Sequence, residues 1–189
     1  TTASTLTTAR ATLVSQLFSG PLPSEVGTLS SVASPIGGLT GLATCEKITM
    51  TAYPSRPRVW TPTSPGTAAV ILHQGHNAYT EAGYSVALQS LLTNGHTVYG
   101  MVMPEGTEIA SASGHTGTPL YQFIGPVIVT LNTALATYAT VHMVGLSGGG
   151  WTTVLAAAAD TRITKSYQFV GSMPLYMYPS RDWEQYLPG

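Results

Sequence analysis

The chain has 189 residues and a mass of 19.7 kDa, which is the size of one domain and excludes a large multidomain enzyme. Only 8% of the residues are charged, against about 25% in an ordinary globular protein. The net charge of −1 provides no basic patch, so the composition argues against binding to nucleic acid or to an anionic membrane surface. A surface so poor in charge favours an extracellular protein or a virion protein.

Two further classes are disfavoured by simple counts. No window reaches the roughly 18 consecutive apolar residues that a membrane-spanning helix needs. Cys45 is the single cysteine, so neither an intrachain disulfide nor a thiolate metal site can form. Histidines and carboxylates do not cluster at metal-ligand spacing either, and we therefore expect no metal and no cofactor.

The N-terminal segment is predicted to form an arm attached to the main domain. Leu6, Leu13 and Leu17 fall at helical spacing, which predicts an amphipathic helix that ends at Gly20 and Pro21. The following segment, 21–41, is rich in Gly, Pro and Ser and predicts an irregular connection. We therefore divide the chain into an N-terminal arm, residues 1–41, and a main domain, residues 42–189.

From residue 45 onward, strand and helix patterns alternate, which predicts an α/β protein with a parallel sheet. The pattern favours a three-layer sandwich with a mostly parallel sheet of about six strands. Pro126 predicts a kink or a late start in the second of its helices. The predicted strands are 47–53, 58–61, 68–72, 97–103, 141–146 and 166–171, and the predicted helices are 81–93, 120–139 and 149–159.

A G-x-S-x-G motif, Gly145 to Gly149 with Ser147 at its centre, lies between a predicted strand and a predicted helix. A nucleophilic serine on such a tight turn needs small neighbours two residues before and after it, because larger side chains would collide with the flanking backbone. The amide of Gly148 opens the following helix, so it can donate a hydrogen bond to a developing oxyanion.

A second loop is expected beside this turn. The strand 68–72 ends in His73-Gln74-Gly75-His76-Asn77. In open α/β sheets, ligands bind at the carboxyl ends of neighbouring parallel strands. Gly75 or His76 is therefore the expected second oxyanion donor.

These residues resemble the α/β-hydrolase fold, and in particular esterase-like hydrolases with a GLSGGGW turn, which is the sequence of residues 145–151. The resemblance extends over residues 45–189. It implies Ser147 as the nucleophile and a small-molecule or polymeric ester or amide as the substrate.

The sequence differs from the family in the position of the histidine that would act as the catalytic base. In the fold's usual order an acid and then a histidine follow the nucleophile, but all five histidines precede Ser147. By strand count, the fold is truncated after its sixth strand. His142 is excluded as the base because its position in the strand places it at the far end of the sheet.

Three explanations stay open. In the first, the base comes from a missing segment or a neighbouring chain. In the second, the acid is relocated to Asp182 or Glu184, and His115 or His76 is the base. In the third, catalysis is lost. In the last case the domain is a structural or binding module, such as a virion or extracellular assembly subunit. A second copy or a neighbouring chain would then cover the exposed sheet edge.

Overall fold

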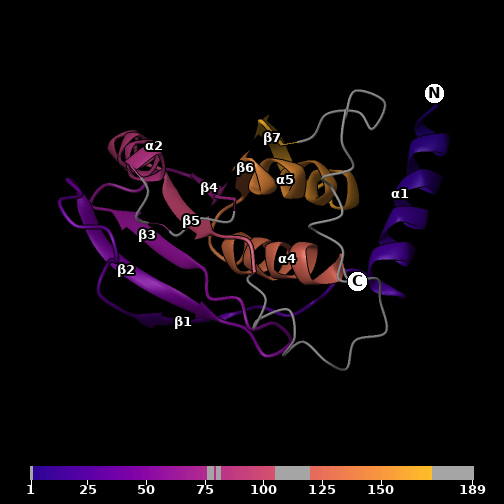
Figure 1. Cartoon of the computed structure of the whole chain (residues 1–189), viewed down its shortest axis with the longest axis horizontal. Coiled ribbons are helices and arrows are strands. Elements are labelled where there is room, and N and C mark those ends of the chain that lie inside the picture. Colours follow the sequence, from indigo (N-terminus) through magenta and orange to yellow (C-terminus); the bar gives the residue numbers. More distant parts are fainter. Residues whose placement is uncertain (1, 76–78, 80–81, 105–119, 172–189) are drawn as a thin grey trace, which may run out of the picture.

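The computed structural model describes residues 2–75, 79, 82–104 and 120–171, which form one seven-stranded sheet with helices on both faces (Figure 1). The strand order is β1-β2-β3-β5-β4-β6-β7. The strands are β1 Thr28–Ser31, β2 Leu42–Thr49, β3 Arg58–Pro62, β4 Ala68–His73, β5 Thr97–Met101, β6 Thr140–Leu146 and β7 Ile163–Phe169. The helices are α1 Ala3–Phe18, α2 Ala82–Thr93, α4 Tyr121–Leu135 and α5 Gly148–Ala159.

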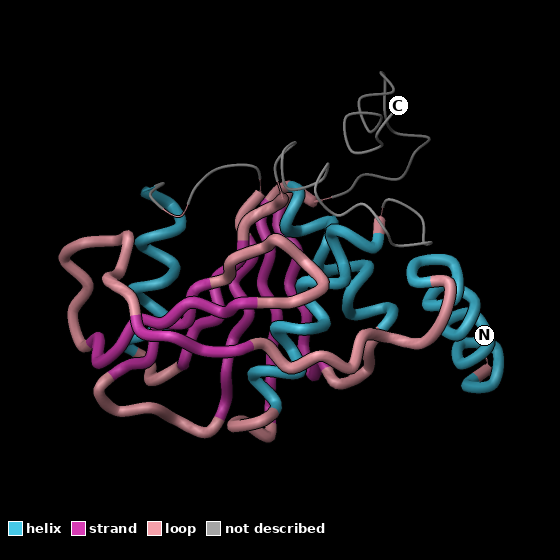
Figure 2. The backbone as a smooth tube through the Cα atoms, turned by 90° about the horizontal axis from the view of Figure 1, so that it is seen from below, coloured by secondary structure: helices cyan, strands magenta, loops and turns pink. Residues whose placement is uncertain are grey.

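The sheet has a parallel half and an antiparallel half. Strands β5, β4, β6 and β7 run parallel to one another, whereas β1, β2 and β3 pair in antiparallel fashion and β3 joins β5. Figure 2 shows the sheet between α2 on one side and α4, α5 and α1 on the other. The predicted three-layer α/β architecture is therefore confirmed, with one strand more than the expected six.

The additional strand lies in the segment that we expected to be irregular. Residues 28–31 pair with β2, but three of their four side chains are exposed. An edge strand of this kind buries little and carries no alternation of apolar and polar residues, so the sequence pattern does not reveal it. In the same region, Leu17 of α1 is buried in the core against α4 and α5. The arm thus contributes both a strand and a core residue to the fold.

Two helices show how local sequence sets the boundaries. Helix α2 ends at Thr93 and is followed by a left-handed Gly95 (φ 79°). The Gly95 N–H donates to the Leu92 carbonyl and the His96 N–H to the Leu91 carbonyl, as expected for a glycine-terminated helix. Helix α4 begins at Tyr121 and continues through Pro126 without the expected late start. It is buried over most of its surface, so packing of its apolar side chains outweighs the one hydrogen bond that the proline removes.

The register brings the carboxyl ends of the central strands together. His73 at the end of β4 is level with Met101 of β5 and with Gly145 of β6. The loops that follow these three strands therefore leave the sheet at one edge, where ligand sites form in open α/β folds. Among the described residues, β7 is the strand at the border of the parallel half. No helix of the described ranges has the length and hydropathy needed to cross a membrane.

Candidate active site

Ser147 occupies the turn between β6 and α5 in a backbone conformation that non-glycine residues rarely adopt. Its φ is 55° and its ψ is −123°, a region that costs a residue with a side chain about 1–3 kcal/mol. The turn is held by the Ser147 N–H, which donates to the Phe169 carbonyl at 2.9 Å, and by the Trp151 N–H, which donates to the Ser147 carbonyl at 3.1 Å. Ser147 itself is exposed. The strained turn therefore presents this hydroxyl to solvent.

Gly145 and Gly149 make this turn possible by removing side chains from backbone contacts. A Cβ on Gly149 would lie 2.7 Å from the carbonyl carbon of His73 and 2.8 Å from the carbonyl oxygen of Gln74. A Cβ on Gly145 would collide with the Gly149 carbonyl. The start of α5 thus packs backbone to backbone against the end of β4, and no larger residue fits at either position.

Two glycines lie beside Ser147. Gly148 is the first residue of α5, and Gly75 is so close that a Cβ added to it would lie 3.4 Å from the Gly148 nitrogen. Two hydrogen bonds hold the Gly75 loop to the end of β5: Gln74 N–H to Met101 O at 2.8 Å and Met103 N–H to Gly75 O at 3.1 Å. The structure therefore brings together three of the predicted site residues, Ser147, Gly148 and Gly75.

His73 holds the Gly75 loop through a hydrogen bond to its backbone. Its side chain is 1% exposed, and its Nδ1 lies 2.6 Å from the Gln74 carbonyl, to which the Nδ1–H donates. Burial lowers the pKa of His73 from 6.5 to about 4, because the charged imidazolium loses its hydration. His73 is therefore neutral near pH 7 and serves to position the Gly75 loop.

The structure places the remaining histidines as follows. His142 on β6 bonds Thr164 through Nδ1 at 2.8 Å, five residues before Ser147 and towards the amino end of the strand. His96 faces the carbonyl of Ala68 at the amino end of β4. The predicted acid Asp182, the predicted base His115 and the predicted oxyanion residue His76 lie outside the described residues.

The sequence suggests that Asp160 and Arg162 cap the end of α5 and pair with each other at the surface. The two side chains do pair, but Asp160 is buried. Asp160 is 3% exposed and accepts hydrogen bonds from Nε and Nη2 of Arg162, which raise the pKa of Arg162 further. Arg162 also donates to Asn132 at 2.8 Å, and Asn132 in turn donates to the Pro23 carbonyl. The Asp160 side chain is therefore buried in the pair, whereas 45% of the Arg162 side chain is exposed.

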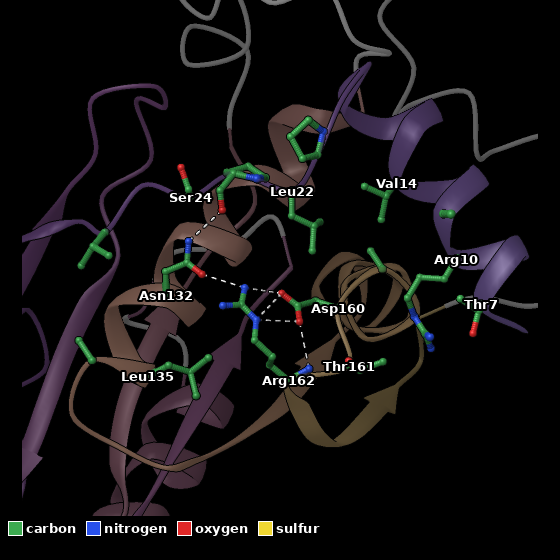
Figure 3. A pocket seen from close by; sticks show the side chains of 16 residues that line it. Thr7, Arg10, Val14, Leu22, Ser24, Asn132, Leu135, Asp160, Thr161 and Arg162 are labelled. Carbon is green, nitrogen blue, oxygen red and sulfur yellow. Dashed lines mark hydrogen bonds and ion pairs between the residues drawn. The ribbon is translucent and has the colours of Figure 1, made fainter. Parts of the chain in front are cut away.

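The same residues border a cavity of about 950 Å³ between α1, α4 and the end of α5 (Figure 3). Figure 3 shows Asn132, Arg162 and Asp160 pointing towards one another along its wall. Asp160 and Arg162 connect α5 to the start of β7, so this cavity lies at the amino ends of the parallel strands. Ser147 lies at their carboxyl ends, and the cavity is therefore not part of the site around it. Within the described part of the chain, no three potential ligands gather as a metal site would require.

No protein-family model matches the sequence, and no curated protein is similar to it at a significant level. Solved structures do share its fold. A cold-adapted esterase from an Arctic intertidal metagenomic library superposes with a TM-score of 0.51 at 13% identity, over 72% of this chain and 60% of the other. The PEG-bound complex of such an esterase gives 0.50 at 14% identity, over 71% and 63%.

Est1E from Butyrivibrio proteoclasticus gives a TM-score of 0.49 at 16% identity, over 66% of this chain and 48% of its own. The chain therefore spans about half to three fifths of the length of these proteins. The likeness to the Arctic esterase confirms the α/β-hydrolase type of fold that the sequence predicts.

Proposed function

We propose that the protein is a serine-dependent hydrolase of carboxylic esters and that Ser147 is its nucleophile. One observation carries the proposal: an exposed serine at φ 55° on the turn from β6 to α5, with Gly75 and Gly148 beside it. Strained residues of this kind cluster at active sites, where the surrounding structure holds them in place. The esterase-type fold supports the same function.

The proposed reaction is acyl transfer to Ser147. The Ser147 Oγ attacks the ester carbonyl carbon, and the carbonyl electron pair moves to the oxygen. The N–H groups of Gly148 and Gly75 donate to that oxyanion, and the dipole of α5 adds to its stabilisation. A base takes the hydroxyl proton and returns it to the leaving alcohol, after which water hydrolyses the acyl-enzyme.

The base and its acid belong to the proposal as well. Our proposed base is His115 and our proposed acid is Asp182, with a histidine from a missing segment or a neighbouring chain as the other source. A serine without a base is a poor nucleophile at neutral pH. We therefore expect His115→Ala to lower kcat on p-nitrophenyl acetate by at least about 100-fold, as loss of a general base does.

A fluorophosphonate probe tests the nucleophile directly. The wild-type chain and Ser166→Ala, which removes an exposed hydroxyl on β7, should both be labelled and should turn over p-nitrophenyl acetate. Ser147→Ala should do neither while it keeps the wild-type circular dichroism spectrum. A folded wild-type chain that is neither labelled nor active would overturn the proposal.

A second candidate is a non-catalytic structural or binding module, for example a subunit of a virion or extracellular assembly. One observation favours it: none of the described histidines forms a hydrogen bond with the Ser147 hydroxyl. This candidate predicts an unlabelled chain and a second copy or a neighbouring chain bound at the sheet edge. Sedimentation of the purified chain, together with the probe experiment, separates the two functions.

A further inference from the structure

A second cavity, of about 540 Å³, lies where β2 ends and β3 begins. Three of the chain's seven Lys and Arg residues line it, namely Lys47, Arg56 and Arg58. No carboxylate is among its described lining residues. Three cations thus gather around one cavity, although the net charge of −1 predicts no basic patch.

The register places two of these cations directly opposite each other. Lys47 of β2 pairs with Arg58 of β3, and like charges at such positions repel each other. The salt bridge in the described part of the chain joins Arg162 and Asp160 instead, so neither Lys47 nor Arg58 is neutralised by a described carboxylate. The Glu25 carboxylate accepts the N–H groups of Thr51 and Ala52 and is not among the residues that line the cavity.

A buried donor also lacks a partner. The Arg58 Nε is shielded from solvent and has no hydrogen bond in the structure, whereas the Arg58 Nη1 is directed to the Arg56 carbonyl at 3.4 Å. An unpaired buried donor is costly, and proteins normally satisfy it. An anion in the cavity would accept from Arg58 and would neutralise the repulsion between Lys47 and Arg58.

The cavity lies at the same edge of the sheet as Ser147. Arg58 is level with Gly100, Gly100 with Leu72, and Leu72 with Val144, three residues before Ser147. From strand spacings of about 4.8 Å and a rise of about 3.3 Å per residue, the Cα atoms of Arg58 and Ser147 are roughly 17 Å apart. A molecule that contacts both positions would have to span about this distance.

We propose that this cavity, the Lys47–Arg58 cavity, binds a carboxylate or phosphate group of the substrate whose ester reacts at Ser147. The assignment to the substrate rests on the proposed function, but the anion site itself does not. It predicts an anionic ester whose charged group is separated from the scissile bond by roughly 17 Å. Arginine and lysine recognise both kinds of anion, and the experiment distinguishes them.

Isothermal titration calorimetry with citrate and with inorganic phosphate tests the site. The control variants are Ser147→Ala and Lys165→Gln, the second of which removes an exposed cation on β7. Both should bind the anion with the affinity of the wild-type chain. Lys47→Gln and Arg58→Gln should bind it at least about 10-fold more weakly. Tighter citrate binding assigns a carboxylate, and tighter phosphate binding a phosphate. If the wild-type chain binds neither anion, or if Lys47→Gln binds as tightly as Lys165→Gln, the site does not exist. Lys47→Gln serves as the test should Arg58→Gln fail to fold.

Ester hydrolysis then tests whether the anion bound in the cavity is part of the substrate that reacts at Ser147. The substrates are p-nitrophenyl monoesters of dicarboxylic acids of increasing chain length and the uncharged alkanoates that match them. We expect kcat/KM to favour the charged ester once its chain reaches the cavity. Lys47→Gln should remove that preference, whereas Lys165→Gln should keep both the preference and the hydrolysis of p-nitrophenyl acetate. Equal rates on both series at every length contradict the substrate assignment. Activity on no ester contradicts the proposed function instead, and calorimetry still decides the anion site.

Discussion

Gly75 packs directly against Ser147, so closely that a Cβ added to Gly75 would lie 3.1 Å from the Ser147 Cβ. The same methyl group would lie 3.4 Å from the Gly148 nitrogen, in the space that we assign to the substrate oxyanion. We therefore expect Gly75→Ala to lower kcat on p-nitrophenyl acetate by about 10- to 100-fold, because small displacements of reacting groups cost that much.

Gly83→Ala is the matched control for this prediction. Among the described residues, apart from its chain neighbours and the backbone of its own helix, no atom lies within 4 Å of a Cβ built at Gly83. The residue lies in α2, where alanine is favoured over glycine. Its kcat should equal that of the wild-type chain. Should Gly75→Ala be as active as Gly83→Ala, the oxyanion does not lie between Gly75 and Gly148.

The packing around Gly149 leads to a prediction about stability. The atoms that its Cβ would meet belong to the backbone of His73 and Gln74, which cannot rotate away as a side chain can. We expect Gly149→Ala to lower the free energy of unfolding by about 3 kcal/mol, the upper end of the usual cost of overpacking, measured by urea denaturation. Gly37→Ala, where no atom of the described residues beyond its chain neighbours lies within 4 Å, should stay within about 0.5 kcal/mol of wild type. Equal stability of the two variants would show that the turn relaxes more freely than its packing implies.

Much of the fold and part of the site could be predicted from the sequence, for identifiable reasons. The turn at Ser147 combines an apolar strand, two spaced glycines and a small-residue helix, and these signals agree with one another. Strand β1 carries no apolar alternation, and its formation depends on pairing with β2. Burial of Asp160 depends on Arg162 and on the distant Asn132, which no local pattern connects.

The Lys47–Arg58 cavity is a further feature that the sequence alone could not predict. Its cations come from two strands, and only the register of β2 against β3 shows that Lys47 and Arg58 face each other. Their density within a chain of so few charges was the available signal, and the sequence alone does not show that they share a cavity. Pairing across a turn, unlike spacing within a helix, requires the structure to fix it.

Arg162 provides a test of the buried pair. Arg162→Gln would leave the Asp160 carboxylate, which is 3% exposed, without its partner. Loss of one member of a fully buried ion pair costs about 3–5 kcal/mol, but solvent reaches Arg162, so we expect a loss of about 2 kcal/mol. Lys165→Gln should change the free energy of unfolding by less than about 0.5 kcal/mol. Adding Asp160→Asn to Arg162→Gln should restore part of the loss, and a double variant no more stable than Arg162→Gln alone would argue against the pair.

His73 predicts how stability changes with pH. The folded-state pKa of about 4 lies below the ordinary value of 6.5, so the unfolded chain binds a proton more readily than the folded chain in this interval. The stability contributed by the neutral, buried imidazole is therefore complete above pH 6.5 and is lost as the pH falls from 6.5 to about 4. The full shift corresponds to about 3 kcal/mol. Urea denaturation at a series of pH values should show this loss in the wild-type chain and a smaller one in His73→Asn, and a proton NMR titration should give the imidazole a pKa near 4. If the His73 ring titrates near 6.5 instead, it does not lie buried beneath the Gly75 loop, and the support that we assign to it is absent.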